Sequence, residues 1–168
     1  MWRCLKNADL VDADLYNLNL KNIDLCNANL YRANLDNADL SYAKMIDTKL
    51  AYSSLTDANL YKVDLTNGNL QFTDLTNANL SHACLSHSNL SFANLFNTNL
   101  YYADLQYTNL TSAKWTFSCL HSHFTVDIDF IQQILACLVS LNCNDPKAKE
   151  IREKILPYAA ADLGLEND

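Results

Sequence analysis

Leucine recurs at every fifth position from Leu5 to Leu120, without a gap or a shift of register. The run contains 24 consecutive units, and only Met45 and Trp115 replace leucine at this central position. In an α-helix, residues five apart lie about 140° apart around the axis. In a strand they alternate between the two faces. Because neither element can bury this pattern, the chain must turn once in each unit and wind into a solenoid with the leucines inside.

The residues before each leucine complete the five-residue unit. A small side chain such as Ala8 lies two residues before the leucine, and this strand-like spacing points both side chains inward. The residue between them is usually Asp or Asn, as at Asp9 and Asn29. We expect it to point outward near a bend, where its side chain can bond local backbone groups and where it tolerates unusual dihedral angles.

The second residue after each leucine predicts how many units make one coil. It is Asn or Asp in nine of the twelve odd-numbered units, whereas most even-numbered units carry a long or aromatic side chain there. This alternation of corners requires an even number of units per coil, and two units would leave no interior. Four is the smallest workable number, which predicts coils of twenty residues and about six coils.

The unit of small residue, Asp or Asn, Leu and two variable residues resembles the pentapeptide-repeat family, over about residues 3–122. The resemblance implies an all-β solenoid, a right-handed quadrilateral β-helix with four pentapeptides per coil. Lys44, Lys49 and Lys114 depart from the pattern at the Asp or Asn position, as Met45 and Trp115 do at the centre. These departures affect local packing and leave the predicted fold unchanged.

After Leu120 the five-residue period stops and a helical pattern begins. Apolar residues then recur at spacings of three and four, at Ile128, Ile131, Ile134, Leu135, Leu138 and Leu141. A second helix is predicted to begin at Pro146. The sequence therefore predicts two parts, a β-helix over 1–123 and a helical segment over 124–168. The segment is either a cap on the last coil, which repeat arrays need, or a homodimer contact, as the resemblance implies for topoisomerase-binding members.

Charge and composition exclude several classes of function. The formal net charge is -7, and between Thr66 and Ala113 the only charged residues are Asp74 and Asp104. Such a surface does not favour the phosphate backbone, so no direct binding of nucleic acid is expected. No apolar run suits a signal peptide or a membrane span, which predicts a cytoplasmic protein with no membrane contact. The six cysteines lack paired spacing and are predicted to be reduced.

Stacking by twenty residues would collect the long corner side chains into two ribs. The first rib contains Arg32, Tyr52, Phe72 and Phe92, with Tyr31 beside it, and the second contains Tyr42, Lys62, His82 and Tyr102, with Tyr61 and Tyr101 beside it. Exposed aromatic ladders can form a protein-binding surface, or they can stabilise the rod by stacking on one another. The candidate partner-binding residues are Arg32, Tyr52, Phe72, Phe92, Tyr42, Tyr61 and Tyr102.

The residue types of a zinc site or a thiol hydrolase occur together once, at His82, Cys84 and His87. The solenoid would place the two histidines at successive corners that face different sides, and no fourth ligand is evident. With only two glycines, a phosphate-binding loop is also absent. The sequence thus predicts no enzyme, no cofactor and no metal site.

The predicted function is a non-enzymatic protein-interaction module or scaffold. The resemblance supplies an alternative, because some members of the family are described as DNA mimics that bind DNA gyrase or topoisomerase. A mimic should carry dense negative charge along its length, whereas residues 1–125 carry 11 acidic and 8 basic residues, a net charge of -3.

Overall fold

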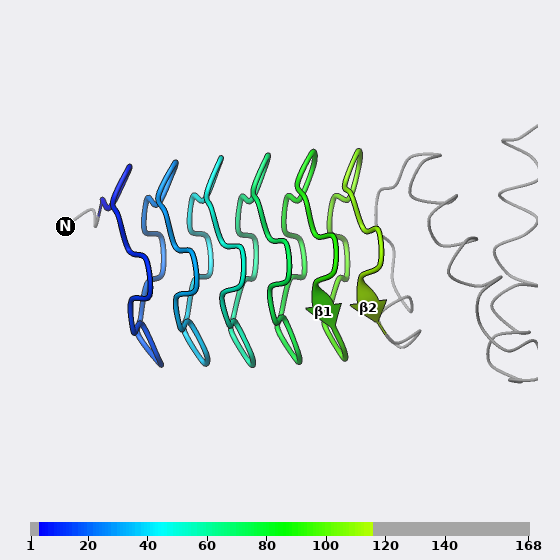
Figure 1. Ribbon diagram of the computed structural model, residues 1–168, viewed down its shortest axis with the longest axis horizontal. Coiled ribbons are helices and arrows are strands. Elements are labelled where there is room, and N and C mark those ends of the chain that lie inside the picture. Colours follow the sequence, from blue (N-terminus) through cyan, green and yellow to red (C-terminus); the bar gives the residue numbers. More distant parts are fainter. Residues whose placement is uncertain (1–3, 116–168) are drawn as a thin grey trace, which may run out of the picture.

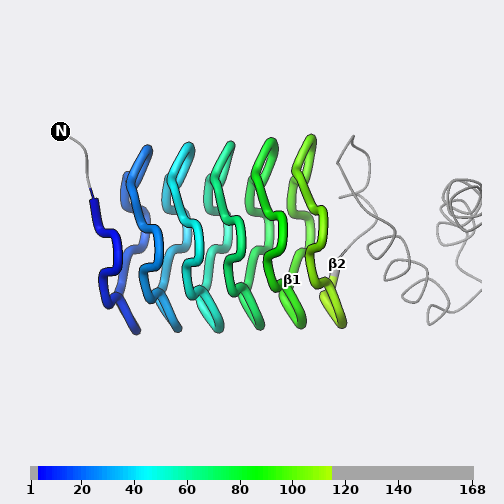
Figure 2. The backbone as a smooth tube through the Cα atoms, turned by 90° about the horizontal axis from the view of Figure 1, so that it is seen from above, coloured from blue at the N-terminus to red at the C-terminus, as the bar shows by residue number. Residues whose placement is uncertain are grey.

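The computed structural model describes residues 4–115, which form a rod of coils stacked along its long axis (Figure 1). Seen from above, successive coils keep the same outline and spacing (Figure 2). Parallel bridges join residues twenty apart, from Cys4 and Asp24 to Asn89 and Asn109. The bridges confirm the predicted coil of twenty residues with four units.

Two pairs of residues extend this bridging far enough to form strands. They are β1 (Asn94–Leu95) and β2 (Lys114–Trp115), which pair in parallel with Asn94 opposite Lys114. Within residues 4–115 there is no helix that could cross a membrane. The predicted helices, and with them the boundary between 1–123 and 124–168, lie outside the described residues. The number of about six coils includes residues beyond 115 and stays a prediction.

Three of the five backbone N–H groups in each unit hold neighbouring coils together. In the unit that begins at Leu25, the N–H groups of Leu25 and Asn27 donate to carbonyl oxygens of the next coil, at 2.7 and 2.9 Å. The N–H of Asn29 donates to a carbonyl oxygen of the preceding coil, at 2.9 Å. Each coil is therefore bonded to both neighbours on all four sides.

The remaining two N–H groups are satisfied inside the turn. The N–H of Ala28 donates to the carbonyl oxygen of Leu25 at 2.9 Å, which closes a four-residue turn. The N–H of Cys26 donates to the Oδ1 of Asp24 at 3.0 Å. The same side-chain bond to the backbone recurs in most units, for example from Tyr61 to Asn59. The predicted contact of the Asp or Asn side chain with local backbone is confirmed, and it satisfies the one donor that the coils and the turn leave over.

The unusual dihedral angles occur at a different position from the one predicted. The Asp and Asn residues before the leucines have no positive φ; instead, all 22 corner residues from Asn7 to Ser112 have φ between 54° and 62°. The prediction was wrong because the third residue of a tight turn, and not the outward residue before it, must reverse the chain. None of these 22 corners is Val, Ile or Thr, although the preceding position holds Val11, Ile46 and Thr56. β-Branched side chains are excluded where φ is positive.

The core is a single column of the central residues and the small residues. From Leu25 to Leu95 every central residue, Met45 included, is at most 1% exposed. Where a hydroxyl replaces alanine, it is bonded, as at Thr48, whose Oγ1 donates to the Met45 carbonyl oxygen at 2.6 Å. The first coil is less covered, with Leu5 38% exposed.

The position along the rod should decide the cost of removing a leucine. We expect Leu65→Ala to lower the free energy of unfolding by about 2–5 kcal/mol, because Leu65 is fully buried between two coils. Leu5→Ala is the matched control at the same place in the unit, and it should cost less than half as much. Urea unfolding followed by circular dichroism measures both. Equal costs would show that the rod does not stack as described.

The corner should reject a β-branched residue that the neighbouring position accepts. We expect Asn27→Val to destabilise the rod by about 1–2 kcal/mol, because Asn27 has a φ of 58°. Cys26→Val, one residue earlier, should cost less than about 1 kcal/mol, because β-branched residues occupy that position in other units. Thermal unfolding of the two variants tests this, and a larger loss for Cys26→Val would contradict it.

Candidate functional site

The first rib is a stack of aromatic rings on one corner of the rod. The ring centroids of Tyr52 and Phe72 lie 4.7 Å apart with 9° between their planes. Those of Phe72 and Phe92 lie 4.8 Å apart with 3° between the planes. The ring of Tyr31, from the preceding position, meets Tyr52 edge to face at 5.6 Å. The structure thus brings together the three aromatic residues that the twenty-residue period predicts.

The corner geometry explains why the rings stack. Tyr52, Phe72 and Phe92 have nearly the same positive φ, between 58° and 62°, so their side chains leave the rod in the same direction. Coils that pair through backbone hydrogen bonds lie about 4.8 Å apart, which is also a favourable distance for stacked rings. Tyr52, Phe72 and Phe92 remain 52%, 44% and 49% exposed. Since the faces of Phe72 are covered by its two neighbours, the ring edges form the exposed surface.

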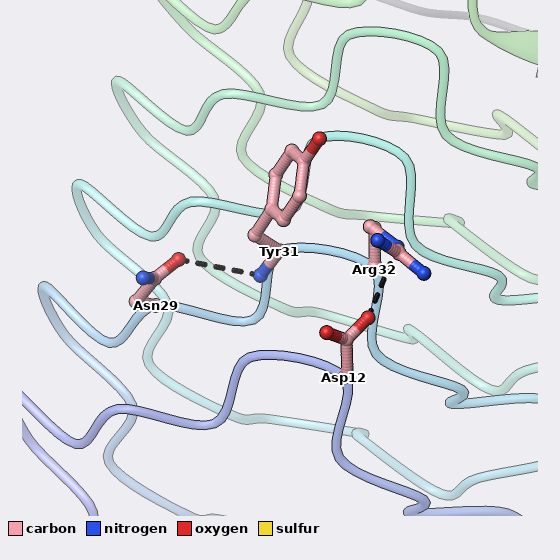
Figure 3. Close-up of polar contacts among 4 residues, drawn as sticks. All are labelled: Asp12, Asn29, Tyr31 and Arg32. Carbon is pink, nitrogen blue, oxygen red and sulfur yellow. Dashed lines mark hydrogen bonds and ion pairs between the residues drawn. The ribbon is translucent and has the colours of Figure 1, made fainter.

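Arg32 occupies the same corner one coil before Tyr52, but its guanidinium group pairs with Asp12 of the preceding coil and not with the aromatic rings. Its Nε lies 3.0 Å from the Oδ1 of Asp12, and both side chains are more than half exposed. Figure 3 shows this ion pair beside Tyr31, whose N–H donates to the Oδ1 of Asn29 at 3.3 Å. An ion pair this exposed contributes little to stability, and it leaves the N-terminal end of the rib without net charge.

The second rib mixes aromatic rings with cations. The rings of Tyr42 and Tyr61 meet edge to face at 5.5 Å. The ammonium group of Lys62 lies 5.8 Å from the centre of the Tyr42 ring and 5.4 Å from that of Tyr61. Contacts of this kind hold a cation over the electron-rich face of a ring. The predicted residues Tyr42 and Tyr61 therefore share one lysine.

His82 continues the second rib towards its C-terminal end. Its ring lies 5.5 Å from Tyr61, 5.1 Å from Tyr102 and 6.1 Å from Tyr101. The rings of Tyr101 and Tyr102 are 4.3 Å apart. A hydrogen bond with the Tyr102 side chain raises the pKa of Tyr101 above its ordinary value of 10.0. His82 thus contacts both Tyr61 and Tyr102, and Tyr61 in turn contacts Tyr42.

Sequence reasoning missed two contacts of the same kind. The ammonium group of Lys21 lies 5.5 Å from the centre of the Tyr42 ring and extends the second rib by one coil. On a third corner, His87 stacks on Tyr107 at 4.8 Å with 13° between the ring planes, and Tyr107 is 60% exposed. The stack of His87 on Tyr107 follows from the twenty-residue period once it is applied to the odd-numbered units, and the contact of Lys21 follows once the position before each corner is included.

The structure places His82 and His87 on different corners, as the solenoid predicts. His82 packs among tyrosines and His87 packs on Tyr107. The Sγ of Cys84 lies 3.2 Å from the Oγ1 of Thr66 in the neighbouring coil. In the described part of the chain, no three His, Cys, Asp or Glu side chains are grouped so that they could hold a metal ion.

Cys4, Cys26 and Cys84 are free thiols. Burial, and after it the hydrogen bond to Asp24, raises the pKa of the Cys26 thiol. The other three cysteines lie outside the described residues.

A ladder of amide side chains borders the second rib. Asn59 donates to Asp39 at 3.0 Å, Asn79 donates to Asn59 at 3.2 Å, and Asn99 donates to Asn79 at 3.2 Å. Burial opposes ionisation of Asp39, but bonds from the Ser41 hydroxyl and backbone N–H, the charge of Lys21 and the Asn59 amide together lower its pKa below the ordinary 3.8. The Asp39 carboxylate thus takes part in the ladder as an acceptor of hydrogen bonds.

Comparison with known proteins supports one family. The model of the pentapeptide repeats matches in eight copies, over residues 8–45, 19–54, 43–81, 53–91 and 78–114. These segments together span more than half of the 168 residues. A search of the curated proteins found no match.

Several solved structures are similar to the chain, and each of the three described below has a TM-score under 0.5. HetL, which is involved in heterocyst differentiation regulation in the cyanobacterium Nostoc sp. strain PCC 7120, is 31% identical over 66% of this chain, with a TM-score of 0.48. The match spans 56% of the HetL chain. A protein of the Arabidopsis thaliana thylakoid lumen is 21% identical, with 84% of this chain and 90% of that chain covered and a TM-score of 0.41. Full-length QnrB1, a plasmid-mediated fluoroquinolone resistance protein, is 15% identical, with 80% and 86% covered and a TM-score of 0.21.

The lowered pKa of Asp39 predicts how the rod responds to acid. Because the folded pKa lies below the unfolded value, the stabilisation is present above about pH 4 and is lost as the pH falls through the folded pKa. We expect Asp39→Asn to keep the bond from the Ser41 N–H, as Asn59 does for Tyr61. Because this variant has no carboxylate at position 39, acid should reduce its stability less than that of the original protein. Urea midpoints of both proteins at neutral pH and at about pH 3 measure it. An equal loss in the two proteins would contradict the assignment.

Proposed function

The chain belongs to the pentapeptide-repeat family, and from this premise we propose that it is a non-enzymatic protein-interaction module that binds a partner protein through its aromatic ribs. The first rib is the principal contact in this proposal. The observation that carries it is the half exposure of Tyr52, Phe72 and Phe92 in one unbroken row. Contiguous exposed aromatic side chains of this kind are typical of protein-binding surfaces.

The energetic balance of the corner supports a role beyond stability. Three residues other than Gly, Asn or Asp at positive φ cost roughly 3–6 kcal/mol together, at about 1–2 kcal/mol each. Two stacked pairs return roughly 1–3 kcal/mol, at about 0.5–1.5 kcal/mol each. Stacking therefore does not fully offset the strain at Tyr52, Phe72 and Phe92. An Asn at each corner would carry less strain, so stacking alone does not make these rings a stabilising choice.

The way in which the rings stack narrows the kind of partner. Sugars and bases bind to the open faces of aromatic rings, and here the faces of Phe72 are covered by Tyr52 and Phe92. Apart from the outer face of Phe92, which no further ring of this column covers because Ser112 follows, the exposed surface is a ridge of ring edges. It has no charged group between Tyr52 and Phe92. A ridge of this shape fits an apolar groove on a protein, where ring edges pack against aliphatic side chains and aromatic faces.

The second rib is a secondary contact in the proposal. Tyr42, Tyr61 and Tyr102 present hydroxyl groups, and Lys62 and His82 lie between them. Tyrosine contributes both apolar area and a hydrogen-bonding group, which suits a contact surrounded by water. The amide ladder that begins at Asp39 flanks this rib with a polar border.

The alternative function, a DNA mimic that binds gyrase or topoisomerase, finds little support on the described surface. Between Thr66 and Ala113 only Asp74 and Asp104 are charged, and a mimic needs regularly spaced negative charge. A supercoiling assay tests it directly, since inhibition or protection of gyrase by micromolar protein would favour the mimic over the ribs.

The test of the proposal removes the three aromatic rings of the first rib and keeps the backbone conformation of the corner. We expect the triple variant Tyr52→Asn, Phe72→Asn and Phe92→Asn to remain folded, because Asn occupies the same corner conformation in other units. It should lose the partner that the full chain captures from a cell extract, measured by affinity purification and quantitative mass spectrometry. The loss should be at least about tenfold, since interface aromatics commonly contribute about 2 kcal/mol or more each.

The matched control is the third corner. His87→Asn with Tyr107→Asn removes an exposed stack of the same geometry and should leave capture of the same partner unchanged. Thermal unfolding of both variants shows that the rods are intact. If the folded first-rib variant keeps every partner, or if the control loses them equally, the first rib is not the contact.

A further inference from the structure

One pair of residues in the fourth coil carries a chemical reactivity that the proposed function does not use. Asn67 is an exposed corner residue and is followed by Gly68. It is the single Asn-Gly pair in the sequence, because the other glycine, Gly164, follows Leu163. We propose that Asn67 is a site of non-enzymatic deamidation, which the folded coil suppresses and opening of the coil releases.

The reaction needs only these two residues and water. The backbone nitrogen of Gly68 attacks the Cγ of Asn67, the new N–C bond closes a five-membered succinimide, and the Cγ–Nδ2 bond breaks. The Gly68 amide proton leaves with the side-chain nitrogen as ammonia. Water then opens the ring at either carbonyl, giving aspartate or isoaspartate. Glycine at the second position leaves the attacking nitrogen without a side chain beside it.

The folded coil holds both peptide groups away from this geometry. The N–H of Gly68 donates to the Leu65 carbonyl oxygen at 2.9 Å, and the N–H of Asn67 donates to the Ser86 carbonyl oxygen at 3.1 Å. The carbonyl oxygen of Gly68 accepts from the Asn89 N–H at 2.8 Å. Ring closure must rotate the Gly68 nitrogen towards the Asn67 side chain, which breaks the bond to Leu65. The reaction therefore proceeds from the population in which this coil has opened.

The two products differ in what they do to the rod. Aspartate fits the corner, since Asp12, Asp47 and Asp57 hold the same conformation, with φ between 55° and 58°. It adds one negative charge to the stretch from Thr66 to Ala113, in which Asp74 and Asp104 are the only charged residues. Isoaspartate adds a methylene to the main chain at the corner and displaces the twenty-residue pairing with the adjacent coils. Only isoaspartate should weaken the coil.

The test follows deamidation of the full chain by peptide mass spectrometry, in native buffer and in urea above the unfolding midpoint. Asn77 is the internal control, because it is a corner residue with φ of 59° and is followed by Ala78 in an equivalent turn. In urea, Asn67 should react several-fold faster than Asn77, and Gly68→Ala should remove the difference. In native buffer, the rate at Asn67 should fall by at least about tenfold.

Equal rates at Asn67 in native buffer and in urea would overturn suppression by the coil. A rate in urea no higher than that of Asn77 would overturn the site itself. Separated isoaspartate-containing protein should unfold at a lower temperature than the variant Asn67→Asp, which has the same charge. If the two unfold together, the predicted damage to the coil is wrong.

Discussion

At every corner the chain places one residue at a φ between 54° and 62°, and in most units it still provides an acceptor for all five N–H groups. The rest of the structure depends on this turn. Three of the N–H groups bond to neighbouring coils, one closes the turn, and one bonds to the Asp or Asn side chain. With the backbone satisfied in this way, the leucines are free to fill the interior, and the corner side chains are left to solvent.

One substitution at the Asp or Asn position shows how an adjacent coil can supply the acceptor that a unit lacks. Ser54 replaces the usual residue, and its short side chain does not bond the N–H of Thr56. That N–H instead donates at 2.9 Å to the Oδ1 of Asp36 in the preceding coil. The hydroxyl of Ser54 donates to the same carboxylate atom at 2.5 Å. The irregular middle of the repeat is thus compensated by a residue of the adjacent coil, at a site that the repeat leaves variable.

Much of the rod was predictable because the same constraint acts 22 times. The five-residue period of Leu5 to Leu110 gave the inward column, and the alternation of Asn with aromatic corners gave the coil of twenty residues. The position of the positive φ was predicted wrongly, because it lies two residues after each central residue and not at the Asp or Asn before it. The evidence was present in the sequence as the absence of Val, Ile and Thr at the corners. An absence of residue types is harder to recognise than a recurring leucine.

The candidate site was predictable in its columns and not in its contacts. A period of twenty places Tyr52, Phe72 and Phe92 in one row, but it does not show whether adjacent rings stack face to face or edge to face. That choice depends on whether the preceding position also carries a ring. In the first rib the positions before Tyr52, Phe72 and Phe92 hold Ala51, Gln71 and Ser91, so the rings stack on one another. In the second rib, Tyr61 and Tyr101 intervene and turn the contacts edge to face.

Both kinds of corner form ladders along the rod, and the difference between them gives a uniform repeat a directional surface. On an Asn corner, the Nδ2 of Asn97 donates to the Oδ1 of Asn77 at 2.9 Å, and the ladder stays compatible with water. On the first rib the stack covers both faces of Phe72 and leaves the edges of Phe72 and Phe92 in water, where apolar area is costly. Since the backbone is the same at both corners, only the side chains distinguish them. The first rib is therefore an apolar ridge that differs from the amide ladders and from the corners that mix tyrosine with lysine or histidine. Its position follows from the choice of residue at every twentieth position.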